Sequence, residues 1–103
     1  MSEKQNHSYE LALNRAYKAM TDVISERAKQ DEKWGEQNHY PQFWLGILGE
    51  EFGELCQPVN ETVFDNGTNL GGYENMRKEA VQVAAVALAF IECLDRNKEK
   101  WEL

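Results

Sequence analysis

The chain has 103 residues, of which 42% are apolar and 28% charged, so it is typical of one globular domain rather than a disordered segment. Its formal net charge of −7 argues against binding along a nucleic-acid polymer, which needs clustered lysine and arginine. A small anionic ligand is not excluded, because a bound metal ion reverses the sign of a local acidic site.

The first predicted element is a helix from about Ser8, a plausible N-cap, to about Trp34, where Gly35 can end it. The N-terminal stretch "MSEKQNHSYE", which includes the start of this helix, is polar and unlike a signal peptide. The apolar stripe of this helix comprises Tyr9, Leu13, Ala16, Met20, Val23 and Ile24. A polar connection, "GEQNHY", follows at 35–40.

Pro41 suits the first turn of a second helix. Pro58 lies late in this segment and is expected to kink or end the helix. The residues 65–72, "DNGTNLGG", are predicted to form a loop. The apolar stripe of the second helix comprises Trp44, Leu48, Phe52, Leu55 and Val59.

A third helix is predicted from about Tyr73 to about Lys98, and no segment has a strand pattern, so the fold class is all-α. The far side of this third helix, away from its main apolar face, is also apolar, at Val81, Ala85 and Leu88. A helix that is apolar on nearly all sides is buried on nearly all sides. We therefore expect a homo-oligomer, dimer or tetramer, that completes four-helix-bundle packing. The main apolar face of the third helix comprises Met76, Val83, Val86, Ala87, Phe90 and Leu94.

The two cysteines, Cys56 and Cys93, show no CxxC spacing and are expected to be free, buried thiols in a reducing compartment. The longest apolar run, 80–91, contains Gln82 and is too short to cross a bilayer. We expect a soluble, cytoplasmic protein with no membrane partner, consisting of a single domain over 1–103.

The segment "LGEEFGEL" at 48–55 places carboxylates beside a buried stripe. At about 100° per residue, Glu51 and Glu54 flank the apolar face, whereas Glu50 points further out. Glu79 projects within the apolar face of the third helix, where a lone charge would be costly. Two antiparallel helices could bring Glu51, Glu54 and Glu79 together around a divalent cation, and oxygen ligands favour Mg²⁺ or Mn²⁺. The alternative is that these glutamates are simply solvated.

The first helix adds polar groups on the stripe of its apolar residues. Arg27 could bind a phosphate, with Asp31 beside it, and Trp34 could stack on a base. The alternative is an Arg27–Asp31 ion pair next to an ordinary core tryptophan. His39, in the polar connection, could contact substrate or lie on the surface. Because the chain has only two histidines, a metal site with nitrogen ligands is poorly supported.

Three segments in this order resemble MazG-like nucleotide pyrophosphohydrolases of the all-α NTP pyrophosphatase superfamily. "EEFGEL" resembles the EExxE motif, and "ENMRKEAVQVAAVALAFIECL" resembles the helix that carries the ExxD motif. The preceding "ERAKQDEKWGEQNHYPQFWLGIL" is similar to the segment that helps to form the nucleotide pocket. The resemblance covers about 24–96.

The resemblance implies a Mg²⁺-dependent hydrolase that converts a nucleoside triphosphate to the monophosphate and pyrophosphate. It implies that Glu51, Glu54 and Glu79 bind the metal, and that Glu50 holds a second ion or a water. By position, Trp34 and His39 fall where members of the family contact the base.

The chain departs from the ExxD pattern at Gln82, which stands where the family has an aspartate. An amide oxygen can still bind a metal, but it brings no charge. The alternative function is therefore a catalytically weak or inactive nucleotide-binding or regulatory protein of the same fold. A purely structural oligomer is a third possibility.

Overall fold

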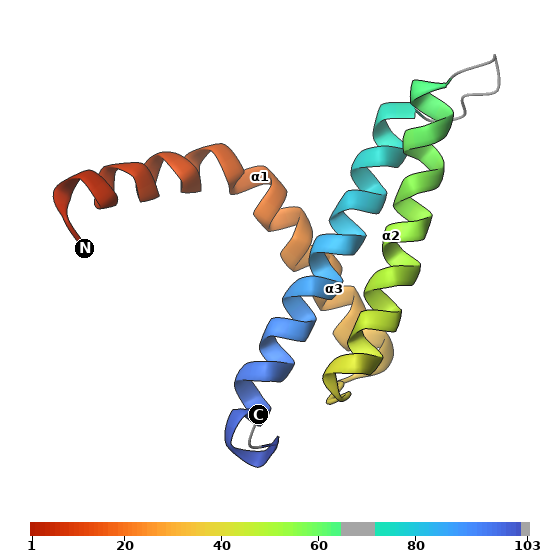
Figure 1. Ribbon diagram of the computed structural model, residues 1–103. Coiled ribbons are helices and arrows are strands. Elements are labelled where there is room, and N and C mark those ends of the chain that lie inside the picture. Colours follow the sequence, from red (N-terminus) through yellow and green to blue (C-terminus); the bar gives the residue numbers. More distant parts are fainter. Residues whose placement is uncertain (65–71, 102–103) are drawn as a thin grey trace.

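The computed structural model describes residues 1–64 and 72–101 (Figure 1). These residues form three helices, α1 (Glu3–Trp34), α2 (Pro41–Val63) and α3 (Gly72–Trp101), and no strand occurs among them. The predicted all-α class is therefore confirmed for the described part of the chain. Helices α2 and α3 lie side by side and antiparallel, and the second half of α1 packs against α3 (Figure 1). The loop predicted at 65–72 falls outside the described residues, except that Gly72 begins α3.

Helix α1 begins five residues before the predicted start at Ser8. Ser2 is the N-cap: its hydroxyl accepts from the amide of Gln5 at 3.2 Å, and the Gln5 side chain accepts from the Ser2 amide at 2.9 Å. This capping box satisfies two amides that would otherwise lack partners, so the helix starts there. The predicted end at Trp34 is confirmed, because Gly35 follows with a φ of 70° and donates its amide to the Asp31 carbonyl.

Pro58 does not end α2, which continues to Val63, so of the two predicted effects of this proline, a kink or an end, the end does not occur. A proline removes only one amide donor from the helical ladder, and the turn beyond it can still form. Here the Thr62 hydroxyl donates to the Pro58 carbonyl at 2.7 Å, which adds a bond across that turn. The predicted first turn at Pro41 is confirmed.

The core lies between α2 and α3 around Trp44, which is 2% exposed. The Trp44 ring stacks on Phe90 with centroids 5.8 Å apart. Cys93 is fully buried, and its thiol donates to the His39 carbonyl at 3.5 Å, which ties the 35–40 connection to α3. Both cysteines are free, as predicted, although Cys56 is only half-buried. Phe52 was predicted to face the core but is 60% exposed.

The second apolar side of α3 is already covered within one chain. Ala85 is completely buried there, and α1 packs on α3 while α2 occupies its other side. The burial of Ala85 therefore does not require the second subunit that the sequence suggested as the simplest cover for this side of α3. The sequence did not indicate that α1 docks on this side of α3, which is why a second subunit was expected to cover it.

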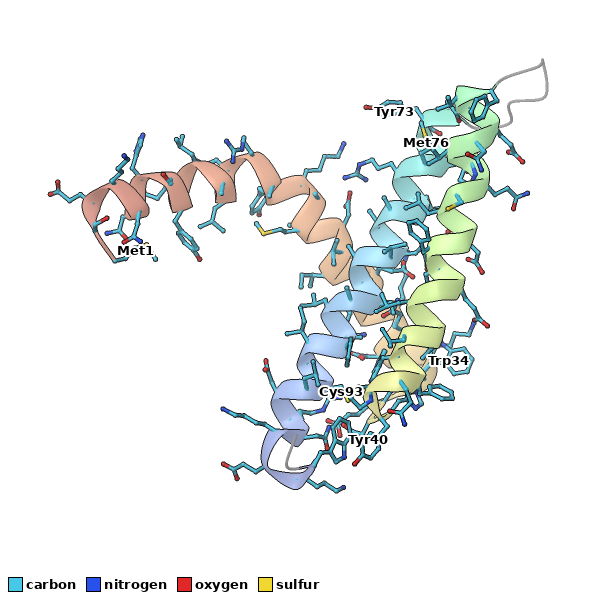
Figure 2. The ribbon with its side chains drawn as sticks, viewed as in Figure 1. Met1, Trp34, Tyr40, Tyr73, Met76 and Cys93 are labelled. Carbon is cyan, nitrogen blue, oxygen red and sulfur yellow. The ribbon has the colours of Figure 1, made fainter. Side chains whose placement is uncertain are left out.

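The first half of α1 extends away from α2 and α3, and Figure 2 shows Met1 at the far end of this arm. Figure 1 shows that α1 changes direction near its middle. There the Thr21 hydroxyl donates to the Lys18 carbonyl at 2.9 Å, a local bond that often bends helices. No residue of α1 is buried, and Tyr9, Tyr17 and Ile24 are all more than half exposed. No helix in the described ranges is long and apolar enough to span a membrane.

Candidate functional site

Three carboxylates from two helices meet where α2 and α3 lie side by side. Glu51 and Glu54 on α2 and Glu79 on α3 each place one oxygen within 4.8 Å of the others. Glu51 and Glu79 are half-buried and Glu54 is exposed. The spacing of three residues puts Glu51 and Glu54 on one side of α2, and the antiparallel neighbour supplies Glu79. The predicted convergence of these three side chains is therefore confirmed.

The electrostatics of this cluster centre on Glu51. Its Oε2 atom is buried and has no hydrogen-bond donor among the described residues. Burial raises the pKa of Glu51, and repulsion from Glu54, Glu79, Glu26 and Glu50 raises it further. A cation would relieve both effects, because it would bind the orphaned oxygen and offset the repulsion.

The spacing of the cluster suits one divalent ion. Two oxygen ligands on opposite sides of Mg²⁺ lie about 4 Å apart, and those of Ca²⁺ about 5 Å apart. Oxygens within 4.8 Å of one another can therefore reach a shared ion after small side-chain rotations. The all-oxygen donor set, with no histidine or cysteine in the cluster, suits a hard cation.

A fourth acid, Glu26 on α1, belongs to the same electrostatic environment and was missed by the sequence analysis. It is half-buried, and its charge contributes to the raised pKa of Glu51. Glu26 follows Val23 of the predicted apolar stripe by three residues, which places both on one side of α1. That spacing was the available signal, but nothing in the sequence predicted that this side of α1 faces the acids of α2.

The remaining candidate metal residues lie at the edge of the cluster. Gln82, one helical turn after Glu79, is half-buried and lines a cavity between α1 and α3 together with Glu26. Glu50 is exposed, as predicted from its direction on α2. The amide of Gln82 therefore lies near the acids without adding to their charge.

A cavity of about 240 Å³ adjoins the carboxylates where the three helices meet. Two tryptophans line it, Trp34 from the end of α1 and Trp44 from α2, and Glu51 lies in its wall. Figure 2 shows Trp34 at the end of α1 near the first half of α2. The indole N–H of Trp44 is buried without an acceptor among the described residues. The other lining residues are Gln30, Gln37, Ile47, Val86 and Ala89.

Arg27 is fully engaged with neighbouring side chains. It donates to Glu92 at 2.7 Å, to Asp31 at 2.9 Å and to Gln30 at 3.1 Å. The hydrogen bond that Arg27 donates to Glu92 is the main reason that the pKa of Arg27 is raised, against the opposing effect of burial. The ion pair with Asp31 is the arrangement expected if the two residues are structural. Both residues line a neighbouring cavity of about 290 Å³, not the one that contains Glu51.

His39 lies apart from the carboxylates. Its ring contacts Phe43, with centroids 4.4 Å apart, and Trp44, at 5.3 Å. It lines a shallow depression with Tyr40, Gln42 and Phe43 rather than the tryptophan cavity. Trp34, which is 61% exposed, thus shares a cavity with Glu51, whereas His39 contacts Trp44 outside that cavity.

Comparisons of this chain with protein-family models, with curated proteins and with solved structures found no match.

Proposed function

We propose that this chain is a Mg²⁺-dependent nucleotide pyrophosphohydrolase, which hydrolyses a nucleoside triphosphate to the monophosphate and pyrophosphate. The observation that carries the proposal is the convergence of three carboxylates within 4.8 Å, beside a cavity lined by two tryptophans. A triphosphate requires charge neutralisation and a base favours an aromatic surface, so the two features suit the two ends of one ligand. The resemblance of the same segments to MazG-like enzymes also supports it.

Glu51, Glu54 and Glu79 would hold the Mg²⁺ ion, and Mn²⁺ has suitable chemistry as well. When bound, such an ion neutralises phosphate oxygens and polarises the phosphoanhydride bond. The orphaned Oε2 of Glu51 supports this assignment, because a buried carboxylate oxygen without a donor is costly in the absence of a cation. Gln82 could add a neutral amide oxygen to the set.

The chemical step is attack by a water oxygen on the α-phosphorus. The bond from that phosphorus to the bridging oxygen breaks, and the bridging oxygen leaves with the pyrophosphate. The water loses one proton, which the exposed carboxylate of Glu50 can accept while it orients the water. Trp34 would stack on the base, and the free N–H of Trp44 could donate to a base acceptor.

The proposed active form is a homo-oligomer with four-helix-bundle packing. The support comes from the first half of α1, whose apolar side chains, including Tyr9 and Tyr17, are exposed in the single chain. Exposed apolar surface on an extended helix is typical of a subunit interface. A second copy is the simplest cover for this arm.

A second candidate function is a catalytically weak or inactive nucleotide-binding protein of the same fold. Gln82 favours it, because the ExxD pattern would place a fourth carboxylate at that position. With an amide there, the site attracts a cation less strongly, while the tryptophan cavity is unaffected.

Pyrophosphate release from a panel of ribo- and deoxyribonucleoside triphosphates, with Mg²⁺ or Mn²⁺, separates these functions. We expect turnover of at least one nucleotide, and a loss of about 100-fold or more in kcat for Glu54→Gln and Glu79→Gln. Glu61→Gln, an exposed change on the same helix as Glu54, serves as the matched control and should keep wild-type activity. Nucleotide binding without turnover would favour the second function. Failure to bind either nucleotides or divalent ions would contradict both.

A further inference from the structure

The largest cavity among those near the carboxylates lies between α1 and α3 and has a volume of about 570 Å³. Three of the eleven basic residues of the chain line it: Lys29 on α1, and Arg77 and Lys78 on α3. Three acids line it as well, Asp22, Glu26 and Glu74, together with the neutral side chain of Gln82. Basic and acidic side chains are therefore equal in number in this cavity, in a protein whose formal net charge is −7. We call it the lysine cavity, after Lys29 and Lys78.

Two of these cations are available to bind a ligand. Arg77 already forms an ion pair with Asp22 at 2.8 Å, which fixes its guanidinium at the wall of the cavity. In the described ranges, no carboxylate oxygen lies within ion-pairing distance of the ammonium groups of Lys29 or Lys78. Free ammonium groups that share a cavity can bind the oxygens of an oligophosphate.

The two cavities follow the same order along both helices that line them. On α3 the lysine cavity spans 74–82 and the tryptophan cavity spans 86–89; on α1 the corresponding ranges are 22–29 and 30–34. Glu79 lies within the first range on α3 without lining that cavity, and Glu51 lies in the wall of the second cavity. The midpoints of the two ranges on α3 are about ten residues apart, which corresponds to about 15 Å along a helix. That separation is comparable to the length of an extended nucleoside triphosphate.

We propose that the lysine cavity binds the pyrophosphate end of the substrate, with the unpaired Lys29 and Lys78 as its positioning residues. This inference rests on the proposed function. The nucleoside lies against Trp34 and Trp44, the α-phosphate lies at the carboxylates, and the β- and γ-phosphates extend between α1 and α3. The scissile bond then lies at the junction of the two cavities, so the monophosphate and pyrophosphate leave from different sides.

The test measures binding of inorganic pyrophosphate, with MgCl₂ present, by calorimetry, and steady-state kinetics on the nucleotide that is turned over best. Lys29→Ala and Lys78→Ala should each weaken pyrophosphate binding about tenfold and raise KM by a similar factor. Inhibition by the nucleoside monophosphate should stay unchanged, because that product occupies the other cavity. Lys78→Arg should restore most of the affinity, and Lys100→Ala, an exposed change near the other end of α3, should have no effect.

The outcomes distinguish this inference from the proposed function. Unchanged pyrophosphate binding in both alanine variants would overturn the inference even if the enzyme is active. Wild-type protein that binds no pyrophosphate would also overturn it. Tight pyrophosphate binding that depends on both lysines, without turnover of any nucleotide, would support the anion site and contradict the proposed hydrolysis.

Discussion

Glu51 is the residue at which stability and the proposed chemistry oppose each other. Its buried oxygen lacks a donor, and burial, followed by repulsion from Glu54 and Glu79, raises its pKa. A carboxyl group with a raised pKa binds its proton more tightly in the folded than in the unfolded chain. Its contribution to the free energy of unfolding therefore falls as pH rises from the ordinary value of 4.5 through the raised value. Such opposition is typical of functional sites.

The variant Glu51→Gln tests this residue in the absence of metal. Because glutamine removes the buried charge, we expect the melting temperature at pH 7, with a chelator present, to rise by a few degrees. The fall in stability above pH 4.5 should also become shallower. Thermal denaturation followed by circular dichroism over a pH series measures both effects. The control is Glu10→Gln, an exposed change on α1, and a lower melting temperature for Glu51→Gln would contradict the assignment.

Gln82 offers the reverse test, because an acid at this position adds charge to the site. Gln82→Asp should tighten Mg²⁺ binding by about tenfold, since ligand charge sets much of the affinity for a hard cation. Calorimetric titration with MgCl₂ measures the change. Gln42→Asp, an exposed change at the start of α2, is the matched control. An affinity equal to that of wild type would exclude Gln82 as a position facing the ion.

At the scale of the elements, α3 is the helix on which the other two pack. Trp44 of α2 packs against its side at Val86 and Ala89, and α1 docks on it nearer Val81. Ala85 is completely buried and lies outside the Trp44 cluster. The small side chain there permits α1 to approach α3 closely, so the position of Glu26 and Lys29 depends on it.

Ala85→Leu should therefore destabilise the protein by about 1–3 kcal/mol, because added methylenes have no space in a packed interface. Ala84→Leu places the same side chain at the neighbouring exposed position and should change the free energy of unfolding by less than about 0.5 kcal/mol. Urea denaturation of both variants measures the difference. Equal stabilities would show that α1 does not pack tightly at this point.

Helix content and the acids of α2 and α3 could be predicted because both depend on local periodicity. The spacing of Glu51 and Glu54, and the place of Glu79 among apolar neighbours, indicated that they would converge. The N-cap of α1 was predicted at Ser8, but the capping box between Ser2 and Gln5 starts the helix earlier. The exposure of Phe52 and the approach of Glu26 depend on how whole helices dock, which the spacing of residues along one helix does not determine.

At the scale of the whole molecule, the first half of α1 is the part that the rest of the chain does not stabilise. A single helix without tertiary contacts is marginal in water, and this one exposes Leu13, Tyr17 and other apolar side chains. Association with another copy would bury these side chains and stabilise the arm. The oligomer and the order of α1 are thus expected to depend on each other.

Size-exclusion chromatography with light scattering tests this dependence. We expect wild-type protein to elute at twice the chain mass of 11.9 kDa or more, and Leu13→Lys combined with Tyr17→Lys to elute nearer one chain mass. Helicity measured by circular dichroism should fall in the same variant. Asn14→Lys adds charge to the same arm without removing apolar surface and should leave the mass unchanged. A monomeric wild-type protein at all concentrations would contradict the proposed assembly.

The two thiols differ in burial, so chemical labelling can follow the local opening of the protein. Cys56 is half-buried, whereas Cys93 is fully buried and donates a hydrogen bond to the His39 carbonyl. A thiol reagent should consequently modify Cys56 readily and reach Cys93 only when α3 separates from the 35–40 connection. The delay between modification of Cys56 and modification of Cys93 would measure how often α3 separates from the 35–40 connection. The same measurement with nucleotide present would show whether a bound nucleotide slows this separation.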